Sequence, residues 1–161
     1  MPTTAANDAV QTTAPGANAG PGADDGLPAG VGVLLFDGSC GLCDGVVQFL
    51  IARDSRRALR FAPLQSPVGR RLLATHGFPA DEVPGSMVYI ENGRALTQSR
   101  AALALARRLD GCWPLLGMFR LVPAIIRDFV YRVVARNRYR WFGHADACRL
   151  PDPSQRDRFL A

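Results

Sequence analysis

The chain has 161 residues, with 19 basic and 14 acidic side chains and a formal net charge of +5. This length suffices for one domain with its own hydrophobic core. Its four cysteines are too few for a secreted scaffold stapled by disulfides, and they favour a reducing compartment in which a close pair is catalytic or metal-binding. The basic balance, carried entirely by arginine, is compatible with an acidic partner, a membrane surface or nucleic acid.

Residues 1–30 are mostly Ala, Gly, Thr and Pro, and we expect them to be a disordered tail because they offer little apolar surface to bury. They lack the basic and apolar regions of a signal peptide. The most apolar region, 113–135, is interrupted by Arg120, Arg127, Asp128 and Arg132, so no membrane-spanning helix is expected. These features predict a cytoplasmic protein.

The first folded elements follow from residue 31. A continuous apolar run at 33–36 is typical of a buried strand, and apolar spacing at 46–53 predicts a helix that ends in arginines. A short strand at 59–62 precedes Ser66 and Pro67, which have the residue types of a helix cap and a first helical position. Gly77 is expected to end that helix.

The next elements are a hairpin and a helix. Strands at 86–91 and 94–96 flank Asn92-Gly93, which predicts a type I′ turn, and Ser99 could cap a helix at 100–109. The expected order is β-α-β-α-β-β-α, with a parallel first pair and an antiparallel edge from the hairpin. This α/β order is thioredoxin-like, with one or two additional C-terminal helices.

A C-terminal helix is predicted by an apolar stripe, which we expect to pack on the sheet while arginines face solvent. Contact of this arginine-rich helix with a membrane surface is the less favoured alternative, and no recognisable nucleic-acid module accompanies it. The stripe consists of Ile125, Ile126, Phe129, Val130, Val133 and Val134.

Cys40 and Cys43 stand at the junction between the first strand and the first helix. A helix N-terminus favours thiolate, and a thiolate attacks disulfides, so we expect Cys40 to be exposed and to act as the nucleophile. Cys43, one helical turn later, would resolve the mixed disulfide. Asp37 could accept the proton of the resolving thiol, or it could simply form the Asp-Gly turn.

These residues resemble the DCC family of thiol-disulfide oxidoreductases, whose Asp-x-x-Cys-x-x-Cys signature corresponds here to Asp37, Cys40 and Cys43. The resemblance covers about 31–150 and leaves 151–161 as a C-terminal tail. It implies a thioredoxin-like fold and a protein-disulfide reductase type of activity. It is carried by residues 36–44, Leu64-Gln65-Ser66, Ser99-Arg100-Ala101, Tyr131 and the run 135–139.

The expected partners are a protein or small-molecule disulfide as substrate and an external thiol as electron donor. No cofactor is expected, because the chain has no evident flavin or nicotinamide site. Pro84 resembles the proline that faces the cysteines in thioredoxins, although Gly85 or Ser86 could occupy that position instead.

The main alternative is a non-enzymatic basic binding module with a structural zinc site. Its ligands would be Cys40, Cys43, His144 and Cys148, since the last two have H-x3-C spacing. The remaining cysteine and histidine have no assigned chemistry: Cys112 is expected in the core and His76 on the surface.

Overall fold

The computed structural model describes residues 30–79, 84–143 and 153–160. The expected disordered tail therefore lies outside the described residues, apart from Gly30. Within the described ranges, no helix is both long and apolar enough to cross a membrane.

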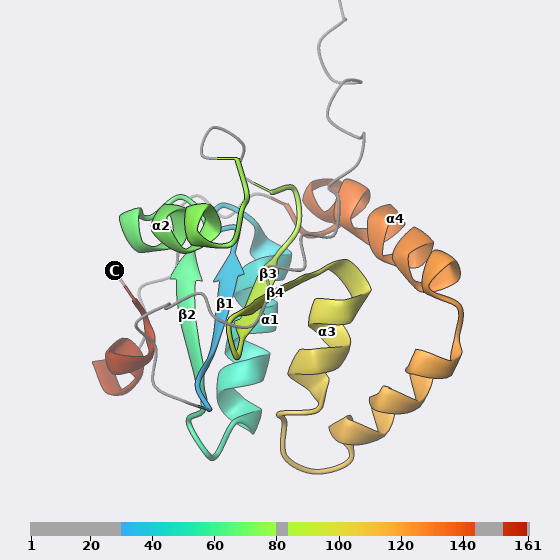
Figure 1. Cartoon of the computed structure of the whole chain (residues 1–161), viewed down its shortest axis with the longest axis horizontal. Coiled ribbons are helices and arrows are strands. Elements are labelled where there is room, and N and C mark those ends of the chain that lie inside the picture. The colour runs from blue at the N-terminus through green and yellow to red at the C-terminus, as the bar shows by residue number, and fades with distance from the viewer. Residues whose placement is uncertain (1–29, 80–83, 144–152, 161) are drawn as a thin grey trace, which may run out of the picture.

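A four-stranded sheet organises the domain, in the order β2-β1-β3-β4 (Figure 1). β1 (Gly32–Phe36) pairs in parallel with β2 (Leu59–Pro63) and antiparallel with β3 (Val88–Glu91). β3 and β4 (Arg94–Thr97) form the antiparallel hairpin at the edge. The predicted parallel pair and antiparallel edge are confirmed, and with them the thioredoxin-like α/β fold.

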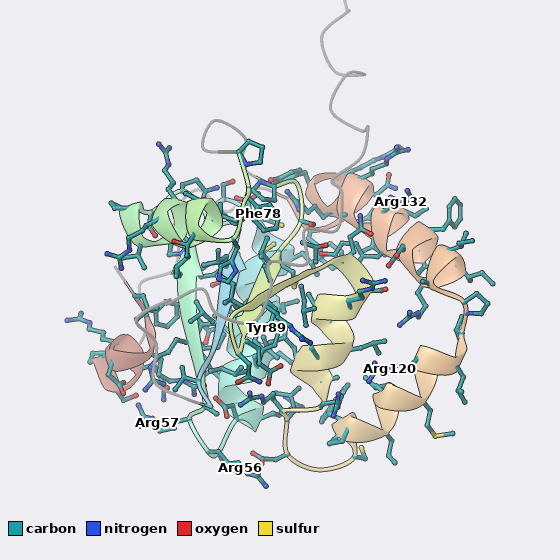
Figure 2. All side chains as sticks on the ribbon, in the orientation of Figure 1. Arg56, Arg57, Phe78, Tyr89, Arg120 and Arg132 are labelled. Carbon is teal, nitrogen blue, oxygen red and sulfur yellow. The ribbon has the colours of Figure 1, made fainter. Side chains whose placement is uncertain are left out.

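Both faces of the central strand are covered, which is why its sequence is continuously apolar. Leu34 and Phe36 pack with α1 (Gly41–Arg53) and α3 (Gln98–Ala106) on one face. Val33 and Leu35, which alternate with them along β1, pack with α2 (Pro67–Thr75) on the other face. Figure 2 shows Tyr89 deep among these side chains, whereas Arg56 and Arg57 lie on the turn that follows α1.

Two local predictions are confirmed in detail. Ser66 caps α2, because its hydroxyl accepts a hydrogen bond of 3.0 Å from the Gly69 backbone N–H, and proline follows it. Asn92 and Gly93 have φ values of 51° and 68°, as a type I′ turn requires. The expectation for Ser99 is wrong: it lies inside α3, and its hydroxyl donates to Asp128 instead of capping the helix.

The C-terminal helices are placed differently from the prediction. A 3₁₀-helix, η1 (Trp113–Leu121), and α4 (Ala124–Phe142) run along the outside of α3, and α4 returns toward the start of α1 (Figure 1). The stripe expected to pack on the sheet is instead exposed, with 80% of Ile125 and 61% of Phe129 accessible to solvent. The sheet face is already covered by α1 and α3, so α4 packs chiefly against these helices. Throughout the described ranges, every exposed large apolar side chain belongs to η1 or α4.

The C-terminal segment is part of the domain, which corrects the expected tail for residues 153–160. η2 (Pro153–Arg158) places Arg158 in the interior, where it pairs with the buried Asp54. Phe159 forms a parallel bridge with Phe61 on β2. The sequence did not reveal this because an arginine and a phenylalanine near a chain end carry no periodic signal.

Candidate functional site

The cysteine pair lies where β1 passes into α1. Cys40 occupies the N-cap position of α1, and Cys43 lies in its first turn. The Cys40 backbone N–H donates to the Asp37 carbonyl at 3.3 Å, and the Asp44 N–H donates to the Cys40 carbonyl at 3.1 Å. The two side chains are neighbours in the same buried cluster, and neither is in a disulfide. The sequence therefore placed the dithiol correctly at the helix start.

Both thiols are buried, with 0% of Cys40 and 3% of Cys43 exposed, so the expectation of an exposed Cys40 is wrong in this structure. The C-terminal end of α4 lies against the first residue of α1. A Cβ atom at Gly41 would be only 2.8 Å from the Phe142 carbonyl oxygen and 3.6 Å from that of Gly143. Glycine at position 41 therefore permits the close approach of the two helix ends beside the dithiol.

Asp37 accepts hydrogen bonds on both carboxylate oxygens. Its Oδ1 accepts from the Ser39 backbone N–H at 3.0 Å, from the Ser39 hydroxyl at 2.7 Å and from Gln65 Nε2 at 3.0 Å. Its Oδ2 accepts from Arg138 Nη2 at 3.0 Å and from the Tyr139 hydroxyl. Asp37 thus connects the turn before the dithiol to the end of α4.

These contacts keep Asp37 ionised. Burial alone would raise its pKa, but hydrogen bonds from Tyr139, Ser39 and Gln65 outweigh that effect and lower the pKa from 3.8 to about 2. A carboxylate with so low a pKa is a weak proton acceptor at neutral pH. The geometry therefore favours an anchoring role for Asp37 over proton transfer.

Arg138 is a site residue to which sequence reasoning gave no chemical role, although it belongs to the C-terminal run of the family resemblance. Its side chain is largely buried, and besides Asp37 it donates to the Gly85 carbonyl at 2.7 Å and to the Tyr139 hydroxyl at 2.9 Å. The sequence pattern of α4 did not indicate a role for Arg138. Arginines at every fourth position, Arg132, Arg136 and Arg140, indicate an exposed face, and Arg138 lies outside this series.

The environment of Cys43 raises the pKa of its thiol. Burial raises the pKa of the Cys43 thiol to about 12, and the hydrogen bond and charge of Cys40 act in the same direction. The positive charge of Arg138 and a hydrogen bond from the Asp37 backbone oppose this rise. Cys43 therefore remains a thiol until a change at Cys40 removes some of these effects.

The segment before β3 also reaches the site. Tyr131 of α4 lies beside the Met87 backbone and the Ser86 side chain. Burial and the nearby Cys43 raise the pKa of the Tyr131 hydroxyl to about 12. Residues 85–87 therefore lie against Arg138 and Tyr131 of α4, and the residue that faces the cysteines among Pro84, Gly85 and Ser86 stays a prediction.

The proposed zinc set is not brought together by the described residues, because His144 and Cys148 lie outside them. Two related expectations are wrong. Cys112 is exposed and not in the core, because the turn before η1 carries it at the surface, whereas His76 is fully buried at the end of α2.

Comparison with known proteins shows which family this chain belongs to. The chain is 48% identical over 128 residues to "Uncharacterized protein YuxK" of Bacillus subtilis (strain 168), an alignment covering 80% of this chain and 93% of the relative. It is 41% identical over 119 residues to "DCC family protein At1g52590, chloroplastic" of Arabidopsis thaliana, covering 73% of this chain and 69% of that protein. No solved structure matches. Residues 34–144, which hold the dithiol, Asp37 and Arg138, match the family model, and the chain belongs to the DCC1-like thiol-disulfide oxidoreductase family.

Proposed function

We propose that the chain is a protein-disulfide reductase that uses the dithiol of Cys40 and Cys43. The observation that carries this proposal is the placement of two free cysteines at the N-cap and in the first turn of α1. A helix N-terminus stabilises the thiolate that starts the exchange, and the second cysteine one helical turn later can resolve the mixed disulfide.

The proposed reaction moves two electrons from the dithiol to the substrate. The Cys40 thiolate attacks one sulfur of a substrate disulfide, forming a mixed disulfide, and the departing substrate thiolate takes up a proton. Cys43 then loses its proton and attacks Cys40 Sγ. This second step forms the Cys40–Cys43 disulfide and releases the other substrate thiolate, which takes up the second proton. An external thiol donor, in a reducing compartment such as the cytoplasm, would restore the dithiol.

Burial supports this assignment of roles. The high pKa of Cys43 suits a resolving thiol, which must not react before the mixed disulfide has formed. Arg138 supplies a positive charge near both cysteines, and its buried Nε has no hydrogen-bond partner among the described residues. We assign Arg138 the stabilisation of thiolate in the site and Asp37 the positioning of Arg138.

Substrate access requires a change at the end of α4. Because Cys40 is completely buried, a substrate disulfide cannot contact its sulfur in this arrangement, and the approach of Phe142 and Gly143 to the adjacent Gly41 is the contact that we propose to open. This contact is small and lies at a helix end, where local opening requires little free energy. The proposal therefore includes a transient opening before the first exchange step.

The test is a redox titration of the purified protein in dithiol buffers, with free thiols and bound zinc quantified. We expect a reversible two-electron transition that Cys40→Ser and Cys43→Ser each abolish. Cys112→Ser is the matched control, because Cys112 is exposed and outside the site, and it should leave the transition unchanged. Thiols that resist oxidation, together with one zinc ion per chain, would instead establish the structural zinc site of Cys40, Cys43, His144 and Cys148.

A further inference from the structure

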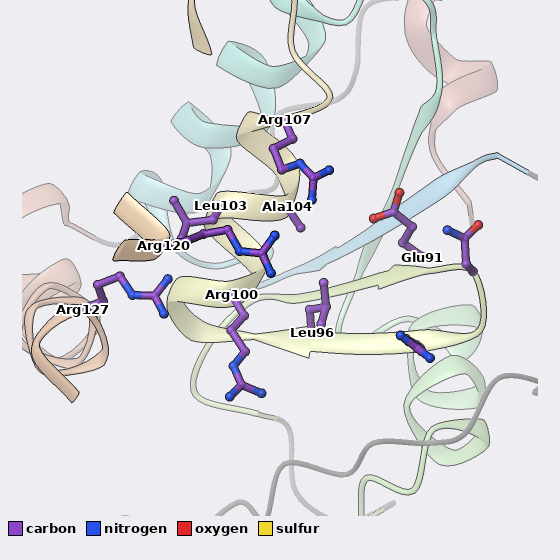
Figure 3. Close-up of a pocket in the computed structure, with 10 residues that line it drawn as sticks. Glu91, Leu96, Arg100, Leu103, Ala104, Arg107, Arg120 and Arg127 are labelled. Atoms are coloured by element: carbon purple, nitrogen blue, oxygen red, sulfur yellow. The ribbon is translucent and has the colours of Figure 1, made fainter. Parts of the chain in front are cut away.

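A second candidate site lies away from the dithiol, between the β3–β4 hairpin and α3 on one side and η1 and α4 on the other (Figure 3). It is an open cavity of about 720 Å³, a size typical of small-molecule sites. Five arginines line it: Arg94 of β4, Arg100 of α3, Arg107 directly after α3, Arg120 of η1 and Arg127 of α4. Leu96, Leu103 and Ala104 supply an apolar wall.

The positive charge of this cavity is not balanced by the protein. Glu91 is the one acidic residue in the lining, and it already accepts a hydrogen bond of 2.9 Å from Arg108 Nε and a second from Arg108 Nη2. In the ranges that the structure describes, none of the five lining arginines forms an ion pair. The cavity therefore holds an uncompensated group of like charges.

The orientation of η1 and α4 makes this group unusual. Helices normally turn apolar residues inward and charged residues to solvent. Here Leu121 is 85% exposed and its neighbour Arg120, also exposed, lines the cavity, whereas Ile125 is 80% exposed while the half-buried Arg127 points toward the cavity (Figure 3). The Nε atom of Arg127 is buried and has no hydrogen-bond partner within the described residues. An anion between the helices would supply that partner and offset the repulsion among the arginines.

We propose that this cavity binds a phosphate-bearing anion. The guanidinium group is planar and presents paired donors that match phosphate oxygens, and several guanidinium groups from different elements can surround one such group. The apolar wall would accommodate a non-polar part of the same ligand. The phosphate could belong to a soluble metabolite or to a lipid headgroup, and in the second case the exposed apolar side chains of η1 and α4 could contact the membrane surface.

The first experiment measures binding of inorganic pyrophosphate by calorimetry at constant ionic strength. We expect the double variant Arg120→Gln/Arg127→Gln to bind roughly tenfold or more weakly than the unmodified chain. The control Arg56→Gln/Arg132→Gln removes the same charge from exposed positions outside the cavity and should bind as the unmodified chain does (Figure 2). Circular dichroism verifies that each variant is folded.

The second experiment distinguishes the two sources of phosphate by sedimentation with vesicles of phosphatidylglycerol or phosphatidylcholine. Binding to phosphatidylglycerol alone, lost in the cavity variant and kept in the control, supports a lipid headgroup. Pyrophosphate binding with the same variant pattern but no vesicle binding supports a soluble ligand. If neither probe binds, or if the two double variants weaken binding equally, the arginines act only as a diffuse positive surface and the proposal is overturned.

Discussion

The contact between Gly41 and the end of α4 can be tested by adding one methyl group. In Gly41→Ala the new Cβ would lie 2.8 Å from the Phe142 carbonyl oxygen, closer than a carbon and an oxygen normally approach. Because this oxygen belongs to the backbone, the end of α4 must move to relieve the contact. Gly45→Ala is the matched control, since it lies in the same helix and its Cβ would meet nothing within 4 Å.

The expected magnitude comes from two opposing effects. Replacing a helical glycine by alanine stabilises a helix by about 0.5–1 kcal/mol, and this gain should appear in Gly45→Ala. Overpacking against a backbone neighbour costs about 1–3 kcal/mol, and this loss should appear only in Gly41→Ala. Urea denaturation should therefore show Gly41→Ala to be less stable than the control by about 1–3 kcal/mol.

Access to Cys40 gives a second measurement of the same contact. In a background of Cys43→Ser, Cys112→Ser and Cys148→Ser, only Cys40 can react with iodoacetamide. A loss of about 1.4 kcal/mol in the closing contact should raise the alkylation rate about tenfold in Gly41→Ala, because the open population rises by that factor. Equal stability and equal alkylation rates in the two alanine variants would refute the claim that α4 covers the dithiol.

Three further predictions concern stability measured by urea denaturation. Asp37→Asn should lower the free energy of unfolding by about 3 kcal/mol, because it leaves the buried Arg138 without its carboxylate. The control Asp157→Asn breaks an exposed pair with Arg57 and should cost less than about 1 kcal/mol. Equal losses would contradict the anchoring role of Asp37. The depressed pKa of Asp37, about 2, predicts stabilisation that is complete above its ordinary pKa of 3.8 and is lost as the pH falls toward 2. Asp37→Asn should lack this part of the acid dependence, and an unchanged profile would show that other carboxylates cause it. Ile125→Ala should change stability by less than about 0.5 kcal/mol and Leu50→Ala should cost about 2–5 kcal/mol, whereas similar losses would place Ile125 in a core.

Predictions that depend on neighbouring residues in the chain were the accurate ones. The cap at Ser66 needs only its own hydroxyl and an N–H three residues later, and the turn at Asn92 and Gly93 needs only two positive φ angles. The apolar run of β1 specified burial on both faces, from which the parallel crossover followed. Local chemistry was therefore enough to place the cysteine pair at the start of α1.

Predictions that depend on distant segments were less accurate. The stripe on α4 was expected to pack on the sheet, but the residues of α1 and α3 already cover that face, and nothing in the stripe itself records this. Similarly, Ser99 has the residue type of a cap, yet its hydroxyl binds Asp128, 29 positions away. The close approach of the end of α4 to Gly41, beside Cys40, joins segments about a hundred residues apart in the chain, which no local pattern around Cys40 could reveal.

Two of the stretches that carry the resemblance to the DCC family, 36–44 and 135–139, are far apart in sequence but meet in the site. Asp37 precedes the dithiol and Arg138-Tyr139 lies near the end of α4, yet all three side chains meet at Asp37 Oδ2. The aspartate is held ionised by this network, so it can balance the charge of Arg138, and the arginine in turn places a positive charge near both cysteines. Removal of either partner would leave the other buried without compensation. The Asp-x-x-Cys-x-x-Cys motif and the arginine-tyrosine pair are therefore parts of one site, in which α4 supplies a positive charge near the dithiol.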